Sequence, residues 1–440
     1  MICSELFIRI RIDTSIQTWV STKVENADGL NAEPIAAFIH LQWNGTKETA
    51  NMKTSKTNQT NSVPLLDVNR GNRAVRNEIM DAIANVVDSG KFLYGPAVGE
   101  LECAVAGVCQ TKHAIGCASG SDALLLALMA LDVGPGDEVI LPSFTFFATA
   151  SCVSRLGAKI VFVDIDPTTY NVSPAAIADA VTTRTKAIIP VHLFGQCAEM
   201  DKICEIADRH QIAVIEDAAQ AIGAAHLSRP AGAWGTIGCL SFYPTKNLGG
   251  MGDGGMLVCH DDAIAAKLRL LASHGMQPRY HHKLVGINSR LDTIQAAILE
   301  VKIKRLDEYT QTRQANAARY ETLFKSVGLG SEFALPHASS DSYHVWNQYG
   351  IRIRDGRRDE LKAHLQARGV GAEIYYPIPL HQQECYLDLG YAEGSLPETE
   401  RAAKEILHLP IYPELTIEEQ MTVVETIESF YQSGAAKKAA

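Results

Sequence analysis

The feature that most constrains this chain is an alternation, from Val63 onward, of short apolar segments with amphipathic helical ones. Segments that are apolar along their whole length are typical of strands buried on both faces of a sheet. Their alternation with helices predicts an α/β protein, with a mostly parallel sheet covered by helices on both sides. The expected strands are 113–117, 138–141, 159–163, 187–191 and 213–215, and the expected helices include 122–131, 145–156 and 199–210.

A different pattern flanks this alternating region on each side. After Asn288 the apolar spacing predicts one long helix to about Phe324, followed by a smaller α+β region with a strand at 345–353. Residues 44–62 are crowded with Asn, Thr, Lys and Ser and bury too little apolar surface to fold. We therefore expect four parts, which are a disordered extension 1–62, a large domain 63–310, a small domain 311–432 and a tail 433–440.

Charge and composition exclude several classes of function. The formal net charge of -10 argues against non-specific binding to nucleic acid or to an anionic membrane. No apolar run approaches the ~20 residues of a membrane helix, and residues 1–20 lack the apolar core of a signal peptide. The adjacent His281 and His282 have no Cys or carboxylate at ligand spacing, so no metal site is expected. We expect a cytoplasmic protein with reduced cysteines.

Three strand ends carry side chains suited to one ligand, because parallel α/β sheets bind ligands at the carboxyl ends of their strands. The first, 117–122, turns through small residues into a helix N-terminus, an arrangement that binds anions. The second ends in Asp217, which either pairs with a pyridinium nitrogen or caps the next helix. The third places Lys246 before a glycine-rich loop, as either a Schiff-base nucleophile in a dry pocket or a solvated lysine.

Taken together and in this order, these segments resemble the DegT/DnrJ/EryC1/StrS family of sugar aminotransferases, which are pyridoxal-5′-phosphate (PLP) enzymes of fold type I. The resemblance extends from about Val63 to Phe430. It implies an aspartate-aminotransferase-like fold, in which helices enclose a mostly parallel sheet and a smaller α+β domain follows. The motifs that carry it are SGSDAL at 119–124, GPGDEV at 134–139, EDAAQ at 216–220, SFYPTK at 241–246 and NSRLD at 288–292.

The resemblance also implies which residues hold the cofactor. Lys246 would form the internal aldimine and move the proton between the substrate carbon and the C4′ atom of the cofactor. Asp217 would pair with the pyridine nitrogen, Gln220 would contact the 3′-oxygen of the ring, and Phe146 would stack on the ring face. The phosphate would be held by Gly120, Ser121 and Ser241, and by Asn288 of the partner subunit, which makes the active unit a homodimer with two shared sites.

The implied reaction moves an amino group from L-glutamate, through pyridoxamine phosphate, to a keto sugar carried by a nucleotide. Segments 274–283 and 375–381 resemble those of members that act on UDP-linked 3-keto-N-acetylhexosamines, including the uronic acid form. Such a product serves amino-sugar or cell-surface polysaccharide biosynthesis. Contacts to the sugar are expected from Arg279, His281, Tyr375 and Tyr376, and a solvated loop charge is the other explanation of Arg279.

Two other interpretations are open at this point. One is a PLP-dependent sugar dehydratase, a branch of the family in which histidine replaces the lysine, and Lys246 argues against it. The other is a non-catalytic regulatory protein that keeps the fold, since a fold alone does not fix an activity. The joint presence of Asp217, Gln220, Lys246 and Asn288 favours the aminotransferase.

Overall fold

The computed structural model describes residues 62–328, 330 and 333–439, with side chains only as far as 432. The chain divides into two compact units, Met1–Thr57 and Asn58–Ala440, and the described residues all belong to the second. The predicted disordered extension 1–62 therefore lies almost entirely outside the described residues.

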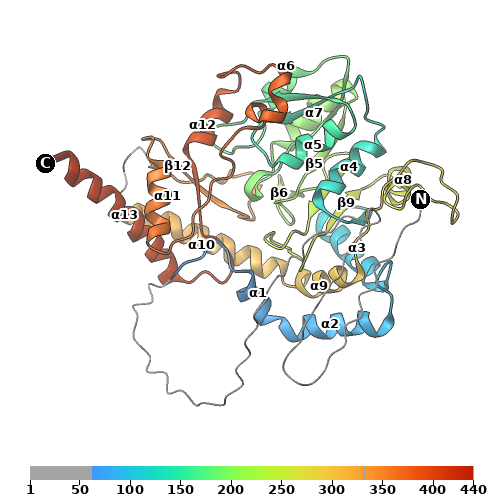
Figure 1. Ribbon diagram of the computed structural model, residues 1–440, viewed down its shortest axis with the longest axis horizontal. Coiled ribbons are helices and arrows are strands. Elements are labelled where there is room, and N and C mark those ends of the chain that lie inside the picture. Colours follow the sequence, from blue (N-terminus) through green and yellow to red (C-terminus); the bar gives the residue numbers. More distant parts are fainter. Residues whose placement is uncertain (1–61, 329, 331–332, 440) are drawn as a thin grey trace, which may run out of the picture. The chain divides into compact units, whose positions relative to one another are not determined.

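A seven-stranded sheet carries the motifs of the alternating region (Figure 1). Its strand order is β1-β9-β8-β5-β4-β2-β3. β9 runs antiparallel to both of its neighbours, and the other pairs are parallel. The predicted mostly parallel sheet is confirmed. The strands are β1 (His113–Cys117), β2 (Glu138–Pro142), β3 (Lys159–Val163), β4 (Thr185–Ile188), β5 (Ala213–Asp217), β8 (Ile237–Ser241) and β9 (Gly255–Cys259).

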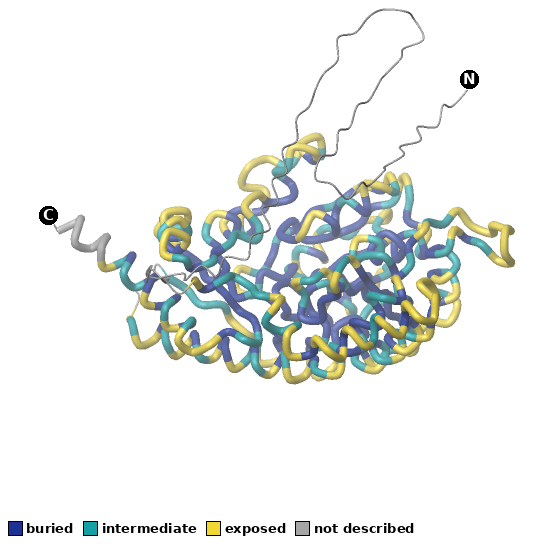
Figure 2. Tube along the Cα trace, turned by 60° about the horizontal axis from the view of Figure 1, so that its bottom comes forward, coloured by how far each residue is buried: buried dark blue, intermediate teal, exposed yellow. Residues whose placement is uncertain are grey.

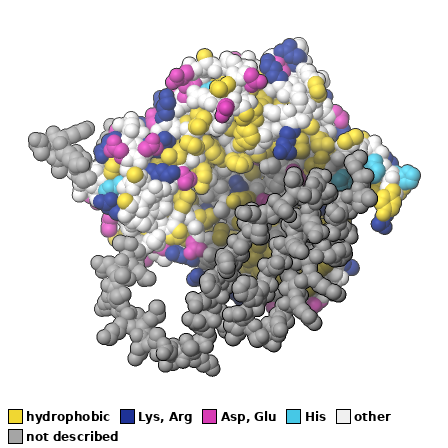
Figure 3. All heavy atoms as spheres, viewed as in Figure 1, with side chains coloured by type: hydrophobic (Ala, Val, Ile, Leu, Met, Phe, Trp, Pro, Cys, Tyr) yellow, Lys and Arg dark blue, Asp and Glu magenta, His cyan; other side chains and the backbone are white. Residues whose placement is uncertain are grey.

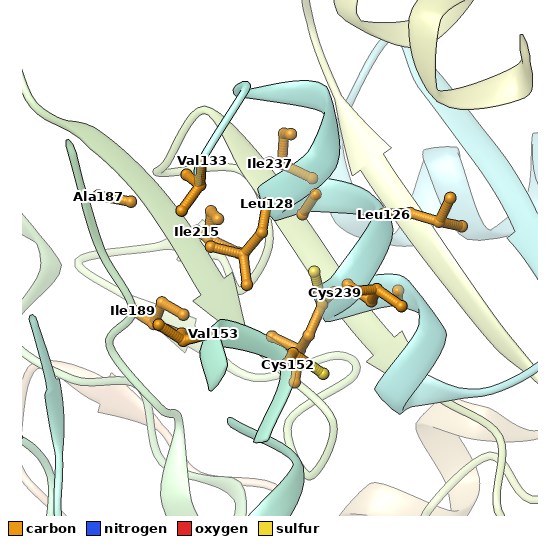
Figure 4. Packing of buried hydrophobic residues seen from close by; sticks show 14 of the residues in the cluster. Leu126, Leu128, Val133, Cys152, Val153, Ala187, Ile189, Ile215, Ile237 and Cys239 are labelled. Atoms are coloured by element: carbon orange, nitrogen blue, oxygen red, sulfur yellow. The ribbon is translucent and has the colours of Figure 1, made fainter. Parts of the chain in front are cut away.

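Helices cover both faces of this sheet because neighbouring positions on each strand point to opposite sides. In β2, Val139 packs in a core with residues of α4 and α5, whereas the adjacent Ile140 packs in a second core with α6 and α7. Figure 4 shows the first core, where Ile215 of β5 lies beside Leu128 of α4. The covering helices are α3 (Pro96–Cys109), α4 (Gly120–Ala130), α5 (Phe147–Arg155), α6 (Pro174–Ala180), α7 (Met200–His210), α8 (Asp262–Leu271) and α9 (Thr293–Ile303).

The single long helix expected after Asn288 is wrong, because the chain forms two helices there, α9 and α10 (Leu306–Val327). Between them Arg305 leaves the helical region of backbone conformation, with φ -111° and ψ 7°. The apolar spacing does not reveal this break, since Ile303 and Leu306 on its two sides pack in the same core.

A smaller antiparallel sheet with the order β10-β12-β13 follows α10. The predicted strand 345–353 is shorter than expected and begins at Tyr349. The reason is that the N–H groups of Val345 and Asn347 donate to the carbonyls of Gly195 and Phe194 in a loop of the larger sheet (2.9 Å each), not to a neighbouring strand. The strands are β10 (Phe333–Ala334), β12 (Tyr349–Ile353) and β13 (Ile406–Leu409).

Helices α10, α11 and α13 pack with this smaller sheet in one core. The division at 310/311 stays a prediction, and α10 runs continuously across that position. The predicted tail from 433 is helical as far as Ala439, where α13 ends. The remaining elements are α1 (Val68–Ala74), α2 (Arg76–Ser89), β6 (Ala225–His226), β7 (Arg229–Pro230), β11 (Ser342–Tyr343), α11 (Arg358–Ala367), α12 (Pro397–Glu405), α13 (Ile417–Ala439) and the 3₁₀ turns η1 (Leu193–Gly195), η2 (Leu380–Gln382) and η3 (Glu384–Leu389).

The described residues offer neither a membrane span nor a metal-binding cluster. None of their helices combines the length and the apolar character needed to cross a membrane. They also contain no group of three or more His, Cys, Asp or Glu side chains placed to hold a metal ion.

Candidate active site

Asp217, the last residue of β5, presents a buried carboxyl at the carboxyl end of the parallel strands. Its Oδ2 accepts a hydrogen bond from the Thr149 hydroxyl of α5 (2.8 Å), and its Oδ1 accepts one from the Ala219 N–H (3.2 Å). Burial raises the pKa of Asp217, an effect that these two bonds and the nearby charge of Lys246 partly oppose. The charged form of such a buried carboxyl is stabilised when a cationic partner binds to it, because the partner supplies the positive charge that the surroundings lack.

The neighbouring Glu216 fixes the end of β5 and thereby the direction of Asp217. Its fully buried carboxylate accepts hydrogen bonds from the N–H groups of Gly232, Trp234 and Gly235 (2.8, 2.8 and 2.7 Å). His192 Nε2 lies 2.8 Å from the same carboxylate. Since successive strand residues point to opposite faces, anchoring Glu216 on one face holds Asp217 on the other.

Lys246 lies in the loop that connects β8 to β9, and its N–H donates to the Tyr243 carbonyl (2.9 Å). Burial lowers the pKa of its amine to about 8, and the nearby Asp217 carboxyl opposes part of that shift. The amine and the carboxyl are therefore close enough to influence each other's charge. A lysine with this pKa carries an unprotonated, nucleophilic amine at mildly alkaline pH. The structure thus brings the two main predicted site residues together.

Helix α9 supports the backbone of the lysine loop from behind. The side-chain oxygen of Gln295 accepts from the Met251 N–H (2.9 Å), and Lys302 Nζ donates to the Gly249 carbonyl (2.5 Å). A Cβ atom on Gly249 would lie 2.4 Å from the Pro244 carbonyl oxygen. The close turn after Lys246 therefore requires glycine at this position.

The predicted phosphate-binding residues meet at the start of α4. Ser119 caps this helix by accepting a hydrogen bond from the Asp122 N–H (3.1 Å), which leaves the first-turn amides of Gly120 and Ser121 at a positive helix end. Gly120 lies directly against Ser241 of β8, because a Cβ atom on Gly120 would lie 2.7 Å from the Ser241 Cβ. Ser121 is exposed and Ser241 half-buried. These residues form one small turn whose free amides and hydroxyls suit an anion.

Gln220 and Tyr376 connect the large sheet to the C-terminal region. The Gln220 side-chain oxygen accepts from the Phe194 N–H (2.7 Å), and its amide donates to the Tyr376 hydroxyl (3.3 Å). The exposed ring of Phe146, just before α5, lies 6.2 Å from the Tyr376 ring. The Tyr375 ring lies 6.0 Å from the Tyr376 ring. Tyr376, predicted as a sugar contact, therefore adjoins the predicted cofactor residues.

The hydroxyl of Ser289, the neighbour of Asn288, accepts from the Ala118 N–H (3.1 Å), so Asn288 lies near the start of α4 in its own chain. Arg279 and His281 make no side-chain contact with the predicted cofactor residues in the described part of the chain. They lie on an exposed segment, 273–288, that leaves the body beside α8 (Figures 1 and 2). The Arg279 guanidinium covers the Tyr280 ring at 4.9 Å, and Asn288 pairs with Ser273. Figure 3 shows histidine, basic and apolar side chains gathered at this edge. The prediction that Asn288 serves the partner subunit stays a prediction.

Thr149 is a site residue that the sequence did not indicate. It is fully buried on α5, and its hydroxyl lies 3.0 Å from that of Thr145 and donates to Asp217. Both threonines occur in a run, FTFFATAS, whose apolar pattern predicts only a helix. The sequence lacked any signal for this contact, because it depends on the rotation of α5 against β5.

The residues present fit PLP. A pyridinium nitrogen matches the buried Asp217 carboxyl, whose surroundings supply no full positive charge in direct contact. An aldehyde matches the Lys246 amine with its lowered pKa. A phosphate matches the helix start at Gly120 and the adjacent Ser241. Each end of the cofactor thus has a chemically suitable partner, and the individual roles stay predictions.

Comparison with known proteins gives one family and many relatives. Residues 73–428 match the model of the DegT/DnrJ/EryC1/StrS aminotransferase family. A pleiotropic regulatory protein of Geobacillus stearothermophilus is 50% identical over 371 residues, covering 84% of this chain and 99% of that protein. The UDP-N-acetyl-3-dehydro-alpha-D-glucosamine 3-aminotransferase of Acidithiobacillus ferrooxidans is 44% identical (84% and 98% covered). The UDP-2-acetamido-2-deoxy-3-oxo-D-glucuronate aminotransferase of Pseudomonas aeruginosa is also 44% identical (80% and 96% covered).

Solved structures show the same fold with related ligands. The S. venezuelae DesV structure, a complex with a ketimine intermediate, superposes with a TM-score of 0.81 at 41% identity, covering 84% of this chain and 98% of that one. The structure of NtdA from Bacillus subtilis with bound cofactor PMP has a TM-score of 0.78 at 34% identity, covering 84% and 85%. The expected fold of the PLP aminotransferases is therefore confirmed.

Proposed function

Because this chain belongs to the DegT/DnrJ/EryC1/StrS aminotransferase family, we propose that it transfers an amino group from L-glutamate to a keto sugar carried by a nucleotide, with PLP held by Lys246. The observation that carries this proposal is the electrostatic coupling of a buried carboxyl, Asp217, with an amine whose pKa is lowered to about 8, Lys246. When bound, PLP supplies an aldehyde that captures amines and a ring that accepts electrons.

The residues of this chain bind and orient the cofactor and move one proton. Asp217, held by the Thr149 hydroxyl, would keep the ring nitrogen protonated. Lys246 would hold the cofactor, and its amine would serve as the base that moves the proton. Gln220 would contact the 3′-oxygen, and the exposed Phe146 ring would cover the ring face.

The phosphate end of the cofactor would anchor the ring. We assign it to the start of α4, where Gly120 and Ser121 offer backbone N–H groups and Ser241 offers its hydroxyl. Asn288 of the partner subunit would complete this end in a homodimer. The exposed side chain of Asn288, near the start of α4 in its own chain, is accessible to a second subunit.

We propose a UDP-linked 3-keto-N-acetylhexosamine or its uronic acid as the acceptor. Two relatives that are each 44% identical carry names of enzymes acting on such sugars. Arg279 and His281 on the exposed segment, together with Tyr375 and Tyr376, would contact the sugar nucleotide. The product class is an amino sugar for polysaccharide or related biosynthesis. Relatives named for dTDP-linked sugars, at 42% identity, make the nucleotide the first variable to test.

A regulatory role without catalysis is the second candidate, because the relative at 50% identity is named a pleiotropic regulatory protein. The buried pair of Lys246 and Asp217 argues against it, since a buried charge costs folding free energy and is retained where it serves a ligand. The lysine also argues against the dehydratase branch, in which histidine stands at this position.

Spectroscopy of the purified protein with PLP separates these candidates. An aminotransferase is expected to be yellow and to bleach on addition of L-glutamate, and Lys246→Ala is expected to lose both properties. Turnover would then be measured with a panel of UDP- and dTDP-linked keto sugars. A wild-type protein that stays colourless after PLP is added contradicts the proposal.

A further inference from the structure

A buried hydrogen-bond network joins two segments of the site that lie far apart in sequence. The Ser143 hydroxyl lies 2.7 Å from His381 Nδ1, and the Ser143 side-chain oxygen accepts from the backbone N–H of His381 (3.1 Å). His381 Nε2 lies 3.3 Å from a carboxylate oxygen of Glu400 in α12. Each of the three residues is 6% exposed or less. Ser143, His381 and Glu400 form what we call the buried bridge.

The hydrogen-bond pattern fixes which atoms of the buried bridge carry protons. Because the Ser143 oxygen accepts from a backbone N–H, its own proton points to His381 Nδ1, which therefore accepts. The ring proton is then on Nε2 and faces Glu400. Burial lowers the pKa of His381, an effect that the bond with Glu400 partly opposes, so the ring is neutral. The bonds run in one direction, from hydroxyl to imidazole to carboxylate.

Serine, histidine and glutamate also form catalytic triads, but the buried bridge is not arranged as one. In a triad the serine bonds to Nε2 of the histidine and the carboxylate bonds to Nδ1. Here the two contacts are exchanged. Ser143 is also 0% exposed, so no substrate carbonyl reaches its oxygen. The buried bridge therefore serves to hold segments in place and not to carry out nucleophilic chemistry.

On one side the buried bridge holds the segment that leads to Phe146. Ser143 lies three positions before Phe146, directly after β2. Of the two residues between them, Phe144 is buried with its ring 6.1 Å from the Tyr376 ring, and the Thr145 hydroxyl lies 3.0 Å from a hydroxyl of α5. A contact thus holds each residue from 143 to 145, and the exposed Phe146 ring follows at once. A shift of Ser143 would therefore shift Phe146.

On the other side the buried bridge holds the loop that carries Tyr376. The loop between Tyr376 and His381 has four residues, two of them proline. Proline fixes φ, so this short loop transmits the position of His381 to Tyr376. The Tyr376 ring lies 6.2 Å from the Phe146 ring, and its hydroxyl accepts from the Gln220 amide (3.3 Å). The two segments that the buried bridge joins thus meet again at the predicted cofactor site.

We propose that His381 is a positioning residue of the cofactor site, acting through its bond to Ser143. This bond fixes the Phe146 ring relative to the Tyr376 ring. The inference rests on the proposed function, in which Phe146 would cover the ring face of PLP and Tyr376 would contact the sugar. Glu400 supports His381 from behind, because its carboxylate also accepts from a backbone N–H of the preceding loop (2.8 and 2.9 Å).

Two substitutions of His381 separate the two side-chain bonds of the buried bridge. His381→Asn keeps an acceptor near the place of Nδ1 for the Ser143 hydroxyl and loses the bond to Glu400. His381→Gln keeps a donor near the place of Nε2 for Glu400 and loses the acceptor for Ser143. Because each variant loses one buried hydrogen bond, both are expected to melt below the wild type.

Hydrogen exchange of the cofactor-free proteins measures whether the buried bridge holds both segments. Exchange is followed by mass spectrometry in peptides that cover 142–149 and 375–383. In both peptides His381→Gln is expected to exchange about tenfold faster than the wild type, and His381→Asn within about twofold of it. Unchanged exchange in His381→Gln, or equal acceleration in both variants, would overturn the proposal.

Titration with PLP, followed by absorbance, measures whether the same bond serves the cofactor site. His381→Gln is expected to bind PLP about tenfold more weakly than the wild type, and His381→Asn to bind it as the wild type does. A purely structural role predicts that PLP affinity falls in both variants, since each loses one bond. Equal PLP affinity in the two variants contradicts the proposal.

His226→Asn is the matched control. His226 is 6% exposed, and its Nε2 also bonds to a carboxylate, that of Asp201 (2.7 Å). The substitution removes this bond, so it is expected to lower the melting temperature and to leave both PLP affinity and the exchange of the two peptides unchanged. A loss of PLP affinity equal to that of His381→Gln would mean that substituting any buried histidine has this effect, and would refute the role of the buried bridge.

The two proposals fail in different ways. A wild-type protein that does not bind PLP contradicts the proposed function, and exchange of the cofactor-free variants still decides whether His381 holds the two segments together. A wild-type protein that binds PLP and is bleached by glutamate, while His381→Gln and His381→Asn bind PLP equally, leaves the proposed function intact and refutes the positioning role alone.

Discussion

Replacing Asp217 by asparagine should raise the stability of the cofactor-free protein and weaken cofactor binding. The side chain is 5% exposed, and the groups that donate to it, the Thr149 hydroxyl and the Ala219 N–H, carry no formal charge. Burial raises its pKa in the folded protein. A carboxyl with a raised folded pKa contributes stability that is present below its unfolded pKa and is lost as the pH rises through the folded pKa. At neutral pH the charge therefore destabilises the cofactor-free fold.

The magnitudes follow from the contacts of this side chain. Asparagine fills the same space, its oxygen accepts from the Ala219 N–H, and its amide donates to the Thr149 hydroxyl, so no polar atom is left unpaired. Removing the charge should stabilise the cofactor-free protein by about 1 kcal/mol, or about 1–2 °C in melting temperature for a unit of this size. Breaking a buried ion pair costs about 3–5 kcal/mol, so the affinity for PLP should fall by a factor of about 100 or more.

The assay combines thermal melting of the cofactor-free proteins with PLP titration followed by absorbance. Asp201→Asn is the matched control, because Asp201 pairs with His226 (2.7 Å) on the outside of α7, and its pKa is lowered. This control should lose a little stability and bind PLP normally. A cofactor-free Asp217→Asn protein that melts below the wild type, or binds PLP equally well, would refute the reasoning.

Three further predictions concern the lysine, an acidic anchor of the sheet and the phosphate turn. Capture of PLP by Lys246 should accelerate as the pH rises through about 8, where the amine loses its proton, and stopped-flow absorbance across a pH series measures this. Hydrogen bonds from Thr182 and Arg184 lower the pKa of Glu138 from 4.5 to about 2. The ionised Glu138 therefore stabilises the fold above pH 4.5, and this stabilisation is lost as the pH falls from 4.5 to about 2. Acid unfolding of Glu138→Gln should accordingly show a weaker pH dependence. Gly120→Ala should weaken PLP binding at least tenfold, because its Cβ would lie 2.7 Å from that of Ser241, whereas Gly107→Ala, with open space around it, should not.

The sequence predicts which residues lie at the strand ends, because strand order decides this, but it does not predict the side-chain contacts that packing decides. Asp217 ends β5, Lys246 follows β8 and the start of α4 follows β1, so the sheet itself brings them to one edge. The bond from Thr149 to Asp217 depends on how α5 rotates against the sheet, which an apolar pattern does not specify. The bond between Gln220 and Tyr376 joins positions 156 residues apart, and no local pattern encodes such a contact.

The break between α9 and α10 is a backbone feature that the apolar spacing of the sequence likewise does not predict. Ile303 and Leu306 continue one apolar stripe across the break between α9 and α10, so the spacing alone predicts a single helix. The late start of the predicted strand 345–353, at Tyr349, has a tertiary cause as well, because Val345 donates to the carbonyl of Gly195, far away in sequence. Contacts distant in sequence decide both boundaries, and periodicity carries no information about them.

Reductive trapping tests the central claim most directly. The PLP-loaded protein is treated with borohydride, digested, and searched by mass spectrometry for the lysine that carries the reduced cofactor. The site described above predicts one modified peptide, that of Lys246. Lys302 is the internal comparison, because burial also lowers its pKa to about 8 and it lies behind the same loop. A cofactor attached to Lys302, or to no lysine, would contradict the assignment.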